Sequence, residues 1–99
     1  MIQARSYFEE FAANDKQKTK LLKVIYKKII DKGFVKELFL GNLIEEGLYT
    51  DKHALRKELD ELVKNNFLYY NPTSAKFKLQ GKSIEIGLML FLREVDSLE

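Results

Sequence analysis

Side chains that could bind phosphate groups lie in two stretches of the second half of the chain. The first stretch, residues 51–66, has the pattern of a helix, and the second, residues 76–79, has the pattern of a strand. Ammonium and guanidinium groups bind the phosphate oxygens of nucleic acids, and such contacts supply most of the affinity for duplex DNA. The predicted nucleic-acid-binding residues are Lys52, His53, Arg56, Lys57, Lys64, Lys76 and Lys78.

The first stretch also contains acidic residues that oppose this function. Residues 51–66 have four basic and four acidic side chains, so the predicted helix is neutral. At about 100° per residue, Asp60 and Glu61 fall on the exposed face beside Lys57 and Lys64. These carboxylates repel phosphates roughly as much as the lysines attract them. The sequence therefore predicts weak, salt-dependent binding of double-stranded DNA, and a protein-interaction domain that binds no nucleic acid is the alternative.

A second basic surface is predicted on the helix over residues 16–32. Lys16, Lys20, Lys23 and Lys27 recur at helical spacing, opposite the apolar side chains of the same helix. A solvated outer face explains this stripe, and contact with flanking phosphates or another anionic partner is the alternative.

The residues predict no catalytic, cofactor or metal site. His53 is the only histidine and the chain has no cysteine, so a zinc site or a cysteine nucleophile is not expected. The run Gly81-Lys82-Ser83 resembles the end of a phosphate-binding loop, but that motif needs a glycine at position 76, which is Lys76. We predict a protein that is not an enzyme, with at most a single anion at the start of the last helix.

One helix and one hairpin position the predicted phosphate-binding residues. Leu55, Leu59, Leu62 and Val63 form one apolar stripe of the helix, which Asp51 or Thr50 caps at its start and Asn65-Asn66 ends. The hairpin consists of an aromatic strand over 67–70, a turn at 71–74 and an alternating strand over 76–79. In the first strand Tyr69 and Tyr70 fall on opposite faces, so one is expected in the core and the other partly exposed.

The rest of the chain supplies more helices. The patterns predict helices over 3–13, 16–32, 36–46 and 84–96, with Gly33 and Gly47 ending two of them and an extended pair at 34–35. A turn at 48–50 joins the third helix to the helix over 51–66 as a helix-turn-helix. The predicted fold is α/β, mostly α: a winged helix-turn-helix core over 16–80, with extra helices in residues 1–15 and 81–97.

Composition limits the remaining possibilities. Ninety-nine residues with a net charge of +2 are typical of one small domain. The absence of cysteine, of a signal peptide and of a long apolar run predicts a cytoplasmic protein without a membrane partner. Leu98-Glu99 is typical of the scar before a purification tag, which suggests a domain cut from a longer protein; a natural ending is the alternative.

The terminal helices predict an interface. In the last helix the core-facing stripe is Ile84, Leu88, Phe91 and Val95, while other apolar residues point away from it. These would be covered by the aromatic first helix, by a second copy in a homodimer, or by a parent domain. The predicted interface residues are Tyr7, Phe8, Phe11, Ile86, Met89 and Leu90.

Residues 62–72, LVKNNFLYYNP, followed by residues 77–82, FKLQGK, resemble the C-terminal winged-helix module of archaeal P-loop ATPases of the signal-transduction type. The resemblance covers roughly residues 17–95. It implies a non-catalytic module that follows nucleotide-binding domains and binds DNA or regulates the ATPase. No nucleotide-binding residue is implied, because the chain has no phosphate loop. A free-standing dimeric transcription regulator is the alternative.

Overall fold

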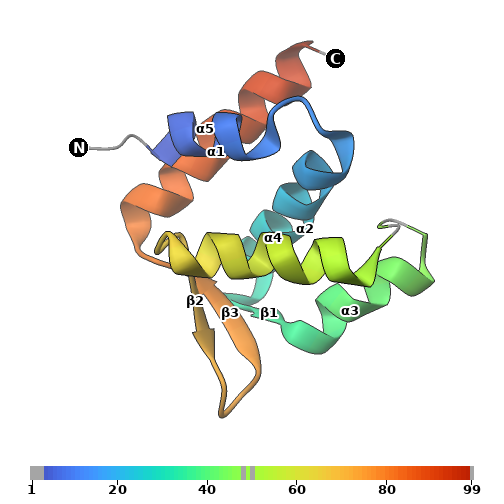
Figure 1. The fold of residues 1–99 in the computed structure, drawn as a ribbon. Coiled ribbons are helices and arrows are strands. Elements are labelled where there is room, and N and C mark those ends of the chain that lie inside the picture. The colour runs from blue at the N-terminus through green and yellow to red at the C-terminus, as the bar shows by residue number, and fades with distance from the viewer. Residues whose placement is uncertain (1–3, 48, 50, 99) are drawn as a thin grey trace.

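Five helices and three short strands make up the part of the chain that the computed structural model describes, residues 4–47, 49 and 51–98 (Figure 1). The predicted mostly helical α/β domain with a β-hairpin is confirmed. In chain order the elements are α1 (Ala4–Ala12), α2 (Lys16–Lys32), β1 (Val35–Lys36), α3 (Glu37–Glu45), α4 (Lys52–Lys64), β2 (Leu68–Asn71), β3 (Lys76–Leu79) and α5 (Lys82–Leu98).

Helix α2 begins and ends where its capping residues predict. The Asp15 carboxylate accepts hydrogen bonds from the backbone N–H groups of Gln17 (2.8 Å) and Lys18 (3.3 Å), which have no partner inside the helix. At the other end Gly33 has a φ of 86°, and its N–H donates to the carbonyl of Ile29 (2.7 Å). The predicted core face of Leu21, Leu22, Ile25 and Ile29 is buried.

Helix α4 has the predicted phase. Asp51 caps its start by accepting a hydrogen bond from the N–H of His53 (2.9 Å). Leu55, Leu59 and Leu62 are buried, and Val63 packs at the edge of the core. The alternative cap, Thr50, lies outside the described residues, as does Leu48. Of the predicted 48–50 turn only Tyr49 is described; it is buried, and its N–H donates to the carbonyl of Leu43 (3.1 Å).

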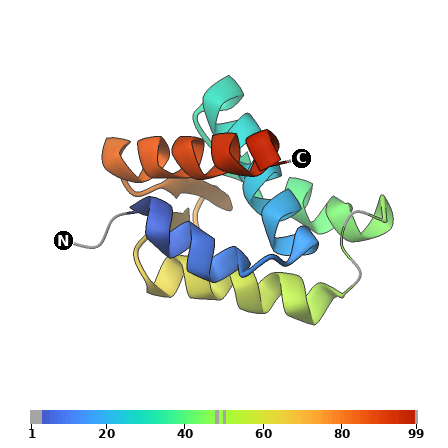
Figure 2. The ribbon, with the colours of Figure 1, turned by 90° about the horizontal axis from the view of Figure 1, so that it is seen from above.

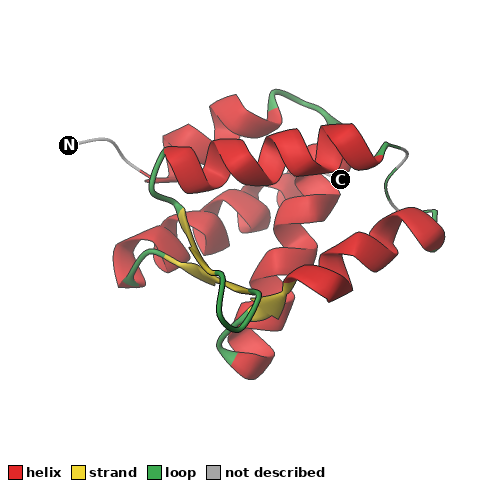
Figure 3. Cartoon of the chain, turned by 60° about the horizontal axis from the view of Figure 1, so that its bottom comes forward, coloured by secondary structure: helices red, strands yellow, loops and turns green. Residues whose placement is uncertain are grey.

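The sheet contains one strand more than the predicted hairpin. Its order is β1-β3-β2, all antiparallel, with Val35 opposite Phe77 and Lys36 opposite Lys76. Figure 3 shows the strands in yellow among the helices. Val35 was predicted as extended chain and Lys36 as the start of the helix, because two residues are too few for a strand pattern. Since β1 pairs with β3, it holds the start of α3 against the hairpin. The N–H of Glu37 also donates to the carbonyl of Ala75 (2.9 Å).

The first and last helices, α1 and α5, lie against each other, as Figures 1 and 2 show. Gly87 of α5 permits this packing, because a Cβ atom there would collide with the Cβ of Ala4 and come within 2.9 Å of the backbone N of Arg5. Leu88 and Phe91 of α5 are buried, and Ile84 and Val95 pack beside them, so the predicted core stripe is confirmed. The helix starts two residues before the predicted position 84.

Candidate nucleic-acid interface

The exposed face of α4 presents the predicted basic side chains to solvent. His53, Lys57 and Lys64 lie on this face with Asp60, and Lys52 stands at the start of the helix; all five are exposed. Within the part of the chain that is described, none of these three lysines forms an ion pair. Their ammonium groups are therefore available to an anionic ligand.

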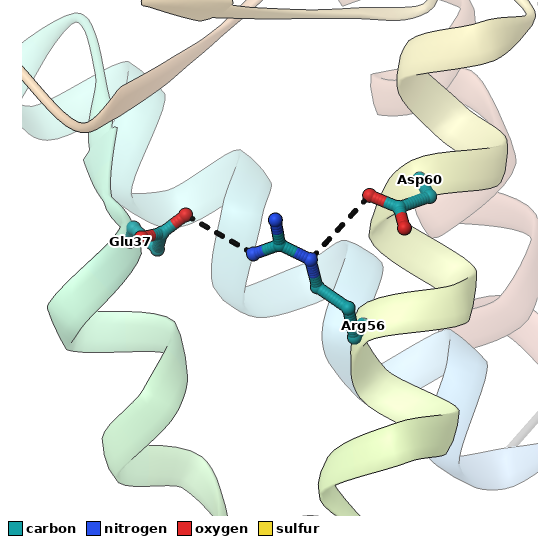
Figure 4. Close-up of polar contacts among 3 residues, drawn as sticks. All are labelled: Glu37, Arg56 and Asp60. Carbon is teal, nitrogen blue, oxygen red and sulfur yellow. Dashed lines mark hydrogen bonds and ion pairs between the residues drawn. The ribbon is translucent and has the colours of Figure 1, made fainter. Parts of the chain in front are cut away.

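Arg56 differs from these lysines because two carboxylates already contact it (Figure 4). Its Nη1 donates to Oε2 of Glu37 at 3.3 Å, and its Nε lies 3.6 Å from Oδ1 of Asp60, one turn further along α4. The contact with Asp60 could be predicted from the i, i+4 spacing in the helix. The contact with Glu37 could not, because Glu37 is nineteen residues away in the sequence. The two carboxylates offset the charge of the predicted phosphate-binding Arg56, so a phosphate competes with them for the guanidinium.

Glu37 also affects the aromatic strand. The pKa of the Tyr70 hydroxyl is raised, first by partial burial and then by the Glu37 carboxylate, which accepts a hydrogen bond from it. Glu37 thus interacts with a helix and with the sheet. Tyr70 packs on Phe77, at 4.7 Å between ring centroids, whereas Tyr69 is 49% exposed. The predicted division of the two tyrosines between core and surface is confirmed.

The outer face of the sheet carries the two predicted lysines of the hairpin and a third that was not predicted. Residues that pair directly share a face, so Lys36 lies beside Lys76, and Lys78 lies beside Tyr69. The Nζ of Lys76 sits 3.9 Å from the ring centroid of Phe34. Sequence reasoning missed Lys36 because it assigned this residue to a helix rather than to a strand paired with β3.

The other basic stretches considered in the sequence lie on other helices, away from the face of α4. Lys82 pairs with Glu85 (3.2 Å) in the first turn of α5. Lys23 of the α2 stripe pairs with Asp96 of α5 (2.9 Å), while Lys16, Lys20 and Lys27 are exposed. The stripe borders a cavity of about 840 Å³ between α2 and α5, rather than the face of α4. Among the described residues, no cluster of three histidine, aspartate or glutamate side chains could hold a metal ion.

The structure corrects part of the predicted interface between terminal helices. Phe8 and Phe11 are buried inside the chain, at 1% and 5% exposure, so they offer no surface to a second copy. Their helical spacing placed them on one face without showing that α5 would cover it. Ile86 and Leu90 remain exposed and Met89 is half-buried, so the dimer prediction now rests on these three side chains.

Tyr7 is held inside the chain rather than directed at a partner. Its ring stacks on Phe67 with the centroids 3.7 Å apart, and its hydroxyl accepts a hydrogen bond from the Asn65 amide (3.4 Å). Burial raises the pKa of this hydroxyl, the nearby Glu61 carboxylate raises it further, and the hydrogen bond from Asn65 partly offsets both. The side chain therefore fastens α1 to the end of α4.

No helix in the described residues is long and apolar enough to cross a membrane. Searches with the chain find no matching family model, curated protein or solved structure. The resemblance to the winged-helix module of archaeal ATPases, and the parent protein that it implies, therefore stay predictions from the sequence.

Proposed function

We propose that this chain is a winged helix-turn-helix module that binds duplex DNA mainly through phosphate contacts. In this proposal α3 and α4 form the helix-turn-helix, α4 enters the major groove, and the β2–β3 hairpin is the wing. The element order from α2 to β3 and the antiparallel pairing of β1 with the hairpin support the assignment. Helices α1 and α5 are additions to that core.

The observation that carries the proposal is a set of lysines without acidic partners on α4 and the sheet. Six lysines on these elements form no ion pair among the described residues, whereas Arg5, Arg56 and Lys82 each do. Exposed ammonium groups of this kind release counterions from DNA when they contact phosphates, which favours binding at low salt. The six are Lys36, Lys52, Lys57, Lys64, Lys76 and Lys78.

The same surface favours sequence-independent binding. Specific reading of guanine commonly uses an arginine whose guanidinium is free to form two hydrogen bonds with the base edge. Arg56 is the only arginine in α4, and it is already bound to Glu37 and Asp60. Base reading by Arg56 competes with these contacts, so the proposed complex depends on phosphates and discriminates weakly between sequences.

The test compares two double variants that remove the same charge from two helices. Lys57→Ala with Lys64→Ala alters α4, and Lys20→Ala with Lys27→Ala alters the exposed stripe of α2. Binding to a labelled duplex of about 20 base pairs is measured by fluorescence anisotropy over a series of salt concentrations. Each phosphate contact contributes about 0.9 to the slope of log K against log salt, so loss of two contacts should lower the slope by about 2 in the α4 variant.

The α2 variant should bind as the wild type does, apart from a small effect of net charge. Equal losses in the two variants would show that the binding follows net charge and not the face of α4. Absence of duplex binding by the wild type at low salt would overturn the proposal and favour the protein-interaction alternative.

A further inference from the structure

The outer face of the sheet combines three lysines with an exposed aromatic ring. Side chains on this face come from alternate strand positions, since the row between them, Val35, Phe77 and Tyr70, points to the core. Lys36 and Lys78 are exposed, and Lys76 is half-buried because its ammonium lies over the Phe34 ring. The face is therefore basic and partly aromatic, and it contains no acidic residue at the paired positions.

Tyr69 is the feature of this face that phosphate binding does not explain. Its side chain is 49% exposed in the middle of a strand, directly opposite Lys78. Tyr7 stacks on Phe67 and Tyr70 packs on Phe77, but among the described residues the Tyr69 ring has no such partner. A flat, uncovered ring between ammonium groups matches the chemistry of a nucleotide, which has an aromatic base beside a phosphate.

We propose that this outer face binds single-stranded nucleic acid, with one base stacked on Tyr69 and the adjacent phosphates held by Lys36, Lys76 and Lys78. Lys76 and Lys78 are two residues apart on one strand, so their Cα atoms are separated by about 7 Å. That spacing is comparable to the distance between neighbouring phosphates in an extended strand. Two lysines and the ring can therefore follow one backbone.

The ligand is single-stranded because the ring needs an uncovered base. In a duplex each base is already stacked on its neighbours and paired, so its face is closed to a protein side chain. Single-strand-binding proteins combine a positively charged surface with aromatic platforms, and each stacked base contributes substantially to the affinity. The two proposals share the lysines of the sheet, but the face of α4 takes no part in the single-strand contact and Tyr69 takes none in the duplex contact. Variants on α4 and at Tyr69 therefore separate the two kinds of binding.

The experiment measures binding of labelled oligothymidylate of about 15 nucleotides by anisotropy at low salt. Tyr69→Ala should weaken this binding about tenfold, whereas Tyr69→Phe, which keeps the ring, should stay within about twofold of wild type. Lys36→Ala should lower the salt slope by about 0.7, the contribution of one phosphate contact in a single strand. Lys27→Ala on α2, an equal loss of charge, is the matched control and should leave the slope unchanged.

Duplex binding by the same variants separates this inference from the proposed function. Tyr69→Ala should leave duplex affinity unchanged, and Lys57→Ala with Lys64→Ala should leave single-strand affinity unchanged. The inference is overturned if the wild type does not bind the oligonucleotide, if Tyr69→Ala binds it as wild type does, or if Tyr69→Phe loses as much as Tyr69→Ala. Circular dichroism checks that each variant is folded. If Tyr69→Ala is not folded, Tyr69→Phe and Lys36→Ala still test the inference.

Discussion

The α1–α5 side of the molecule and the α4–sheet side contain similar residue types, but these side chains have partners within the chain on the first side and are exposed on the second. Where α1 meets α5, Tyr7 and Phe8 contact other rings, and the Arg5 guanidinium donates to the Glu94 carboxylate at 2.7 Å. On α4 and the sheet, six lysines have no acidic partner among the described residues, and the Tyr69 side chain is 49% exposed. Groups with partners inside the chain contribute to stability, and groups without them are available to a ligand. Substitutions on the two sides should therefore separate folding from binding.

Phe8→Ala should have the largest effect and should act on folding. The side chain is 1% exposed between α1 and the rest of the core, so its loss leaves a cavity and should cost about 3–5 kcal/mol of unfolding free energy. Tyr69→Ala, the matched truncation on the other side, should cost about 1 kcal/mol or less. Urea denaturation of both variants measures the difference. Similar losses would contradict the division between the two sides.

Gly87→Ala should also destabilise the chain, by about 1–3 kcal/mol. A Cβ atom at this position collides with α1, so the helices must separate although alanine favours a helix. Gly41→Ala in α3 is the control, because nothing lies within 4 Å of the Cβ it adds. That variant should gain up to about 1 kcal/mol from helix propensity. Thermal unfolding checks the opposite signs, and a stabilised Gly87→Ala variant would show that α1 is not held tightly.

Lys76→Ala with Lys78→Ala should act on binding and leave folding nearly unchanged. Neither lysine forms an ion pair among the described residues, and only Lys76 contacts a ring, that of Phe34, so the unfolding free energy should change by about 1 kcal/mol or less. Affinity for all DNA sequences should fall alike, and the salt slope for duplex should drop by up to about 2. Anisotropy titrations on two unrelated duplexes check this result. Unchanged binding would remove the hairpin from the proposed interface.

Glu58→Gln should have the smallest effect, and its sign depends on pH. Burial raises the pKa of the Glu58 carboxyl; Asp15 and Glu61 raise it further, while Lys18 lowers it. One carboxylate oxygen of Glu58, Oε2, is buried and has no hydrogen-bond partner within the described part of the chain. The pKa of Glu58 is higher in the folded state than in the unfolded state. Ionisation of Glu58 therefore destabilises the fold as the pH rises from the unfolded-state pKa to the folded-state pKa. The glutamine variant should therefore gain at most about 1 kcal/mol at neutral pH.

That gain should disappear below about pH 4, where the Glu58 carboxyl is protonated in both states. Glu10→Gln removes an exposed carboxylate from α1 and serves as the control. Urea titrations at neutral pH and at about pH 4 make the comparison. A gain that is equal at the two pH values would exclude a role for the ionisation of Glu58.

Local patterns in the sequence predicted the elements that have strong periodicity and clear caps. Asp15, Gly33 and Asp51 marked helix ends through hydrogen bonds made within a few residues, and the leucines of α4 gave its buried face. The features that were missed depend on contacts between distant residues. The pairing of Val35 with Phe77 turned a presumed helix start into a strand, and it brought Lys36 onto the basic face.

The candidate site shows the same limit. The exposed residues of α4 could be predicted from helical phase. The ion pair between Arg56 and Glu37 could not be predicted, because it depends on how α3 crosses α4. Likewise, the aromatic residues of α1 could be assigned to an interface from their spacing, yet only the packing of the other elements on α1 shows that Phe8 and Phe11 are covered within the chain.

The contact between α1 and α5 has a consequence for how the chain folds during synthesis. The first described helix packs against the last, so Phe8 has no contact with Phe91 of α5 until nearly all described residues have been made. The β1–β3 pair likewise joins residues 35 and 77. Contacts of such long sequence separation form late and slow folding. A nascent chain that ends before α5 should therefore expose aromatic surface and remain open to proteases. Protection should appear in a single late step, once α5 has been made.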